Sequence, residues 1–184
     1  TVVGTNEAKI KMEIPKSVGP SVALSIEDAA GYLSTYGAYV QGYSKLKITA
    51  TPTLAYGSPI KTYEITADGA SYSASPATTP ALQGKGVLEV TAKVVDNRDR
   101  SSTVASQPIT VLEYAKPVVN LSAYRCNSSG TPDPEGEYMK IVVTSTISSL
   151  NGKNSATYTV VHPGGTVTGN GTSYTSPVLT CDVA

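Results

Sequence analysis

The stretch Gly86-Val-Leu-Glu-Val-Thr-Ala-Lys-Val-Val95, which continues through Asp96-Asn-Arg-Asp-Arg100 to Leu112, decides the fold of this chain. Its apolar and polar residues alternate, a period typical of a half-buried strand. Asp and Asn then favour a turn, because their side chains bond nearby backbone. The chain returns through Ala105, Ile109 and Val111, again alternating. The stretch therefore predicts a long hairpin, which needs a second sheet to bury its apolar face.

Composition supports an all-β protein. The 184 residues include 12 Tyr but no Phe or Trp, and 14 basic residues balance 14 acidic ones. Tyr and β-branched residues favour pleated, half-buried surfaces. Zero net charge gives no electrostatic reason to expect nucleic acid or an acidic membrane as partner. No apolar run approaches the ~20 residues needed to cross a bilayer.

Turn signals upstream of the hairpin divide the chain into further short strands. Alternating residues predict strands near 22–26, 46–50, 63–65 and 71–75, with a short one at 81–82, and Asp68-Gly69 is a strong hairpin turn. About seven strands in some 95 residues are typical of an immunoglobulin-like or fibronectin-III-like sandwich. We assign this module to residues 20–113.

A preceding alternating segment stands apart from that module. Ile10, Met12 and Ile14 alternate with charged residues, and Lys16–Gly19 follows as a linker. We interpret residues 1–15 as the terminal strand of a preceding module.

The pattern restarts after Tyr114–Pro117. Pro117–Ser122 and Pro20–Ser25 share the form P-x-V-x-L-S, and three later segments also match in order (139–143 with 46–50, 158–160 with 63–65, 171–175 with 69–73). This order predicts a tandem repeat, with a second Ig-like sandwich over residues 117–184. The second copy lacks an equivalent of Gly86–Leu112, so we expect it to be incomplete, either C-terminally truncated or completed by strands from elsewhere.

No catalytic constellation emerges from the sequence, and none of its motifs indicates a cofactor. His162 is the single histidine and precedes Pro163-Gly-Gly, in a turn. Asp96, Asn97 and Asp99 are candidate metal ligands, because Ca²⁺ prefers carboxylate and amide oxygens. Arg98 and Arg100 lie in the same turn, however, and favour a hairpin turn with local ion pairs instead.

Two other residue groups have alternative interpretations. Cys126 and Cys181 are a candidate disulfide, or two separate thiols. A Gly-rich loop holds a set of four tyrosines, which either form a contact surface or pack over the end of the sandwich. These tyrosines are Tyr32, Tyr36, Tyr39 and Tyr43.

Several segments resemble tail structural proteins of siphophages and prophages, the large tail-tip or baseplate-region proteins. The resemblance rests on Tyr39–Ile48, Lys61–Ile65, Val94–Asp96 with Arg98 and Arg100, and Ser122–Cys126, and covers most of residues 16–160. It implies strings of Ig-like or fibronectin-III-like modules in the virion. The usual turn after the Asp96 strand has Gly, and here Asp99 takes that place. No functional residue of that family is carried over.

These observations favour a non-enzymatic tail module that acts as a rigid spacer and as a contact with the host surface. Expected partners are other tail proteins, copies of the chain itself, or host cell-wall polysaccharide. The alternative is an adhesin repeat on a bacterial cell surface that binds carbohydrate or calcium. Junctions that contain Pro (Lys16–Pro20 and Tyr114–Pro117) are stiffer than Gly/Ser linkers, which favours the spacer.

Overall fold

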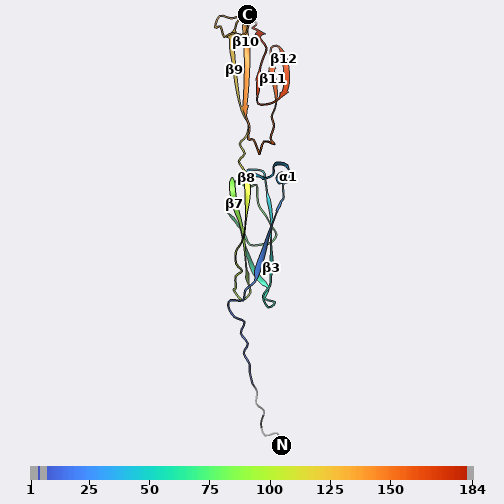
Figure 1. Cartoon of the computed structure of the whole chain (residues 1–184), viewed down its shortest axis with the longest axis vertical. Coiled ribbons are helices and arrows are strands. Elements are labelled where there is room, and N and C mark those ends of the chain that lie inside the picture. Colours follow the sequence, from blue (N-terminus) through green and yellow to red (C-terminus); the bar gives the residue numbers. More distant parts are fainter. Residues whose placement is uncertain (1–3, 5–7, 182–184) are drawn as a thin grey trace. The chain divides into compact units, whose positions relative to one another are not determined.

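The computed structural model describes residue 4 and residues 8–181, and its elements are almost all strands. One short helix, α1 (Tyr32–Tyr36), accompanies fourteen strands in the described residues. The predicted all-β class is thereby confirmed (Figure 1). No helix in the described part of the chain is both long and apolar enough to span a bilayer.

The first sandwich consists of two sheets whose strands are mostly antiparallel. One has the order β1–β3–β6, from β1 (Ser21–Asp28), β3 (Leu46–Thr53) and β6 (Ala77–Thr78). The other has the order β2–β8–β7–β4–β5, from β2 (Tyr39–Val40), β8 (Ala105–Leu112), β7 (Gly86–Asp96), β4 (Ile60–Ala67) and β5 (Ala70–Tyr72). Only β2 runs parallel to its neighbour, β8.

Alternate residues of these strands form the core. Val90, Ala92 and Val94 of β7 are fully buried, whereas Glu89 between the strand's apolar residues is exposed. Leu46 and Ile48 of β3 are equally buried. The predicted hairpin Gly86–Leu112 is therefore confirmed, and its apolar face closes the core.

Two details of the first sandwich differ from the sequence prediction. Residues 81–82 form no strand, although Leu82 is buried; the strand instead is β6, where Ala77 pairs with Ile48. Such a two-residue strand depends on its partner and has no period of its own to detect. The strand predicted at the N-terminus is also absent: residues 8–15 form none, and residues 1–3 and 5–7 lie outside the described part.

The second sandwich has one sheet built around β10 (Tyr138–Thr146). β9 (Val118–Cys126) pairs along one edge of β10, and β13 (Ser173–Thr175) and β14 (Leu179–Thr180) pair along the other. A separate two-stranded sheet joins β11 (Thr157–His162) to β12 (Gly165–Asn170) (Figure 1).

The predicted incompleteness of the second sandwich stays a prediction, but one strand of this sandwich has fewer partners than its match in the first. β4 of the first sandwich pairs with β5 on one side and β7 on the other. β11 corresponds to β4 by sequence, yet in the described chain it pairs with β12 alone. Among the described residues, no strand pairs with the other edge of β11.

The contacts divide the chain into two compact units. Residues 1–30, 45–82 and 87–109 make up one, and residues 31–44, 83–86 and 110–184 make up the other. The predicted module boundaries at residues 20–113 and 117–184 follow the sequence repeat instead, and they stay a prediction.

Candidate functional site

The turn after β7 is organised by Asp96, whose side chain is only 1% exposed. Its Oδ1 accepts hydrogen bonds from the backbone N–H groups of Arg98 and Arg100, both at 2.9 Å. Its Oδ2 lies 3.6 Å from Nε of Arg98. Burial raises the pKa of Asp96, but those N–H groups, the Ser58 hydroxyl and the Arg98 charge together hold it below its usual value. Asp96 therefore stays ionised and fixes the turn.

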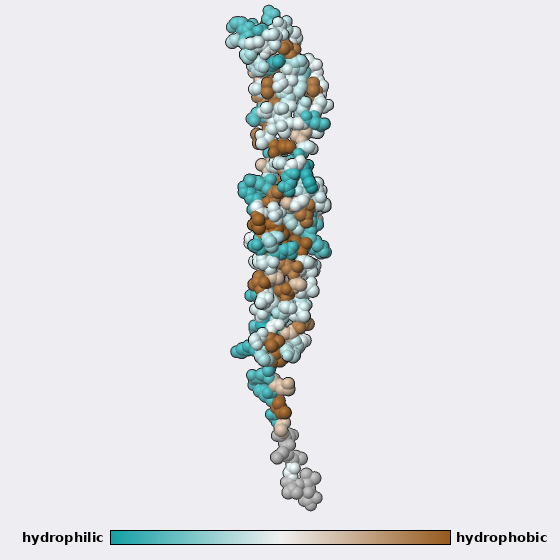
Figure 2. Space-filling view, viewed as in Figure 1, coloured by the Kyte–Doolittle hydropathy of each residue, from teal (hydrophilic) through white to brown (hydrophobic). Residues whose placement is uncertain are grey.

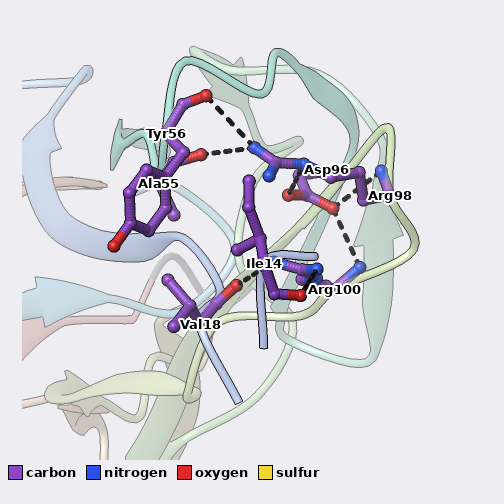
Figure 3. Close-up of polar contacts among 7 residues, drawn as sticks. All are labelled: Ile14, Val18, Ala55, Tyr56, Asp96, Arg98 and Arg100. Atoms are coloured by element: carbon purple, nitrogen blue, oxygen red, sulfur yellow. Dashed lines mark hydrogen bonds and ion pairs between the residues drawn. The ribbon is translucent and has the colours of Figure 1, made fainter. Parts of the chain in front are cut away.

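The Arg98 side chain extends from this turn to a neighbouring loop (Figure 3). Its Nη2 donates to the carbonyl of Ala55 at 2.6 Å and lies 3.4 Å from that of Tyr56. Tyr56 has φ 49°, and Gly57 has φ 67°, so the loop turns tightly there. Arg98 satisfies carbonyls that such a turn leaves without strand partners.

Arg100 instead holds the segment that precedes β1. Its Nη1 donates to the Val18 carbonyl at 2.7 Å and its Nη2 to the Ile14 carbonyl at 2.9 Å (Figure 3). Gly19 of the same segment packs closely against the backbone that follows Arg100, because a Cβ there would lie 3.0 Å from the Ser101 carbonyl oxygen. We call Asp96, Arg98 and Arg100 the Asp96 clasp.

Two of the three candidate metal ligands have other side-chain partners, and the third, Asn97, donates its backbone N–H to the Pro59 carbonyl at 3.0 Å. Asp99 Oδ1 pairs with Nζ of Lys61 at 2.6 Å, and Asp96 faces Arg98. Asp99 has φ 57°, the left-handed conformation in which glycine is common. The described residues contain no group of three or more His, Cys, Asp or Glu side chains placed to hold a metal. The ion pairs of Asp99 with Lys61 and of Asp96 with Arg98 are local pairs of the kind expected of a hairpin turn.

Three of the four loop tyrosines join a fourth from the next segment. Tyr32 and Tyr36 lie on one face of α1, four residues apart, and their rings stack at 6.3 Å. Tyr43 lies 5.8 Å from Tyr32 and makes an edge contact of 4.9 Å with Tyr114. We call these four rings the tyrosine cluster.

Tyr39 is not part of this cluster. It is 6% exposed and pairs with Val111 in the sheet, so its assignment as a contact residue is wrong. β2 has only two residues and both are buried, so no alternation marks Tyr39 as a core residue. Tyr43 is 42% exposed and is the most exposed of the four rings in the tyrosine cluster.

The tyrosine cluster packs on the loop that follows β10. A pocket of about 180 Å³ lies among the rings, Val40, Leu150 and Asn154. Asn151 Nδ2 donates to the Tyr36 carbonyl at 2.9 Å. The hydrogen bond with Tyr43 and burial raise the pKa of Tyr114 above its usual value.

His162 has a structural position at the end of β11. Its Nδ1 accepts a hydrogen bond from Gly164 N–H, which leaves Nε2 as the protonated nitrogen, 3.0 Å from the Tyr174 hydroxyl. Tyr174 belongs to β13, so His162 ties the β11–β12 hairpin to the other sheet. Both ring nitrogens have partners, and the side chain is half-buried.

Cys126 and Cys181 are free thiols, so the disulfide is not formed. Cys126 pairs with Tyr138 from one edge of β10, while Thr180 pairs with Tyr138 from the other. Neighbouring strands lie about 4.8 Å apart, so residues on either side of β10 are separated by about twice that distance. A disulfide requires Cα atoms within roughly 7 Å.

Comparison with protein families gives a match over most of the chain. The model of a family described as "Siphovirus protein of unknown function (DUF859)" matches residues 1–159. The chain belongs to this siphovirus family.

Two further comparisons accompany the DUF859 match. A search of curated proteins found no match. Among solved structures, the chain is similar to fibronectin(III)-like modules of Clostridium thermocellum CbhA, at 24% identity and a TM-score of 0.40. That similarity covers 52% of this chain and 48% of the other, so the chain spans about half the length of that structure.

The sequence of this DUF859 chain did not predict the distant carbonyls that Arg98 and Arg100 bind, nor the packing of Tyr114 against other tyrosines. Arg98 and Arg100 were recognised as part of a motif, but their acceptors lie 43 to 86 residues earlier in the chain. Tyr114 was assigned only to a junction. Its position beside a Pro-containing junction was the available signal for a packing role.

Proposed function

We propose that this siphovirus protein is a non-enzymatic structural module of the phage tail, located in the virion, that acts as a rigid spacer. The family supports a phage component over an adhesin repeat of a bacterial surface. The side chains first considered for chemistry, His162 and Asp96, are engaged in fixing turns. The observation that carries the proposal is that both predicted junctions are held by side chains.

The first junction precedes β1. Arg100 donates to two carbonyls of this segment, Ile14 and Val18, and Pro20 at its end is buried. Hydrogen bonds from a charged donor are worth about 1.5–3 kcal/mol each in favourable settings. A segment held in this way bends less than a solvated linker.

The second junction, Tyr114–Pro117, and the residue before it are held by polar and aromatic contacts. Ala115 N–H donates to Ser148 Oγ at 2.8 Å, and that hydroxyl lies 3.3 Å from the Ala115 carbonyl. Glu113 pairs with Lys85 at 2.6 Å, and Tyr114 packs in the tyrosine cluster. These contacts lie within one compact unit of the chain.

Backbone ¹⁵N relaxation tests the spacer. We expect residues 113–117 of the wild type to be as ordered as the flanking strands, with order parameters near 0.85. Tyr114→Ala should lower these values at the junction and leave those of β3 and β7 unchanged. Tyr56→Ala, which removes a 74% exposed ring outside the cluster, is the matched control. A junction already mobile in the wild type would contradict the spacer.

The partners of such a spacer are other tail proteins, copies of the chain itself, or host cell-wall polysaccharide. The exposed part of Tyr43 is the surface that best fits a polysaccharide, because aromatic rings offer a large area at small entropic cost. Binding of the protein to purified bacterial cell walls, compared with Tyr43→Ser, tests this contact. Equal retention of both proteins would exclude Tyr43.

A further inference from the structure

The aromatic pocket of about 180 Å³ in the tyrosine cluster is a local feature on an otherwise mixed surface. On the face that Figure 2 shows, strongly apolar residues lie in small patches separated by polar ones. Large continuous apolar patches are the usual mark of a protein interface. Closely packed side chains leave few voids larger than a water molecule, so the pocket is more than packing requires.

The rings that line this pocket have different orientations. The ring planes of Tyr32 and Tyr43 make an angle of 57°, and those of Tyr43 and Tyr114 make an angle of 87°. The centroids of neighbouring rings lie 4.9 to 6.3 Å apart. A cation is attracted to an aromatic face when it lies within about 6 Å of the ring centroid. This spacing therefore allows one positive group to contact more than one ring.

The polar side chains of the lining have little hydrogen-bonding capacity to offer a ligand. Asn154 supplies the amide, whose Nδ2 donates to the Ser148 carbonyl at 2.7 Å and whose Oδ1 accepts from Ser155 N–H at 3.1 Å. The hydroxyls of Tyr43 and Tyr114 share a hydrogen bond. A sugar ring has several hydroxyls, which need new partners when they lose water. A quaternary ammonium group needs none, because it carries methyl groups and no N–H.

The loop after β10 holds this pocket in place. Leu150, which lines the pocket, is buried and has φ 47°, and Asn151 and Gly152 follow with φ 59° and 72°. Left-handed backbone is costly for leucine and persists only where the surroundings fix it, often at ligand sites. The Asn151 side chain bonds the Tyr36 carbonyl and so ties this loop to the end of α1. A pocket held in this way reduces the entropic cost of binding.

We propose that the tyrosine cluster binds a quaternary ammonium group, such as the trimethylammonium head of choline. A cavity of about 150 Å³ holds one benzene-sized molecule, so the pocket suits one compact head and not an oligosaccharide. Tyr43 is partly exposed, so the remainder of a ligand can extend into solvent. The inference rests on the host contact proposed for Tyr43, and it names the charged group that a wall polysaccharide would present there.

Titration of the full chain with choline chloride, followed by NMR of labelled tyrosine rings, tests the proposal. We expect saturable shifts of the four rings of the cluster, with a Kd in the millimolar range or lower, and no shift of Tyr56. Dimethylbutanol is the neutral analogue of choline in which carbon replaces the ammonium nitrogen. It should bind at least roughly fivefold more weakly, because attraction to the ring faces requires the charge. Sodium chloride at equal ionic strength is the control for screening.

Substitutions at Tyr43 separate cation binding from hydrophobic packing. Tyr43→Phe keeps the aromatic face and should bind choline like the wild type, whereas Tyr43→Leu should bind it about fivefold more weakly. Tyr56→Ala, outside the cluster, is the matched control and should bind like the wild type. The comparison of choline with dimethylbutanol uses the wild type, so it holds even if Tyr43→Leu disturbs the loop.

Four results would each overturn the proposal: choline shifts that do not saturate, shifts outside the cluster, equal binding of choline and dimethylbutanol, or equal affinity of Tyr43→Phe and Tyr43→Leu. Retention on cell walls without choline binding would refute the ammonium group and leave the host contact standing. Choline binding without retention would support the pocket and refute only the contact.

Discussion

A buried carboxylate is costly unless hydrogen bonds compensate for lost water. Asp96 meets this condition at Oδ1 through local backbone, whereas its buried Oδ2 has no hydrogen-bond partner and lies 3.6 Å from Nε of Arg98. Its Oδ1 accepts from two N–H groups of the turn that it fixes. The same turn directs Arg98 and Arg100 to carbonyls of two other segments. One side chain therefore sets the position of two cations that hold the chain together.

Asp96→Asn should lower the melting temperature by roughly 5 °C near neutral pH, because the amide loses the charge that the two N–H groups and Arg98 favour. The sign of the pH effect follows from the lowered folded-state pKa. The contribution of Asp96 is complete above its ordinary value of 3.8 and is lost as pH falls through the lower folded-state pKa. Thermal melts between neutral pH and strong acid measure both effects.

Asp99→Asn is the control for this substitution, since the Asp99 side chain is 72% exposed and its ion pair is solvated. We expect little change in its melting temperature. Equal losses in the two variants would show that burial of Asp96 is not the cause.

At the scale of elements, period-two alternation predicted β1, β3, β4, β7 and β8 because each buries one face. It missed α1, a single turn between Gly31 and Gly37, both with left-handed φ. It also predicted a strand at Ile10–Ile14, which has the right pattern but forms no strand with the other described residues. Alternation reports which residues suit a sheet, whereas pairing depends on residues far away in sequence.

The link between β9 and β10 depends on a close approach at Gly136. A Cβ at this position would overlap the backbone carbonyl of Cys126, which cannot move without breaking the β9–β10 pairing. We expect Gly136→Ala to lower the free energy of unfolding by about 3 kcal/mol, measured by urea denaturation.

Gly152→Ala provides the comparison. Nothing lies within 4 Å of a Cβ there, and φ is +72°, so only the left-handed backbone opposes the substitution. Its expected cost is about 1 kcal/mol. A smaller loss for Gly136→Ala than for Gly152→Ala would refute the close-approach argument.

At the scale of the whole molecule, the contacts at the two junctions decide how strongly the chain is held there. The sequence identified both junctions from their prolines and named Arg98 and Arg100 as part of a motif. It could not show that Arg100 binds Val18 and Ile14, which lie 82 and 86 residues away. Nor could it separate buried Tyr39 from the exposed tyrosines, because Tyr39 lies in the same Gly-rich segment as three members of the tyrosine cluster.

Arg100→Ala should release the segment before β1. The Val18 amide, which bonds the Pro15 carbonyl at 3.1 Å, should exchange with deuterium at least roughly tenfold faster. Amides of β3 and β7 should be unaffected. Lys47→Ala, which removes an exposed pair with Glu27, should leave Val18 exchange unchanged. Unaltered exchange in Arg100→Ala would mean that the guanidinium does not order this segment.

Cys126 ends β9 and Cys181 directly follows β14, so they lie beside opposite edges of β10, and both are free thiols. No oxidation step is therefore needed for these strands to pair. The pairing of β9 and β14 with β10 should therefore be the same in a buffer with a thiol reductant as in one without.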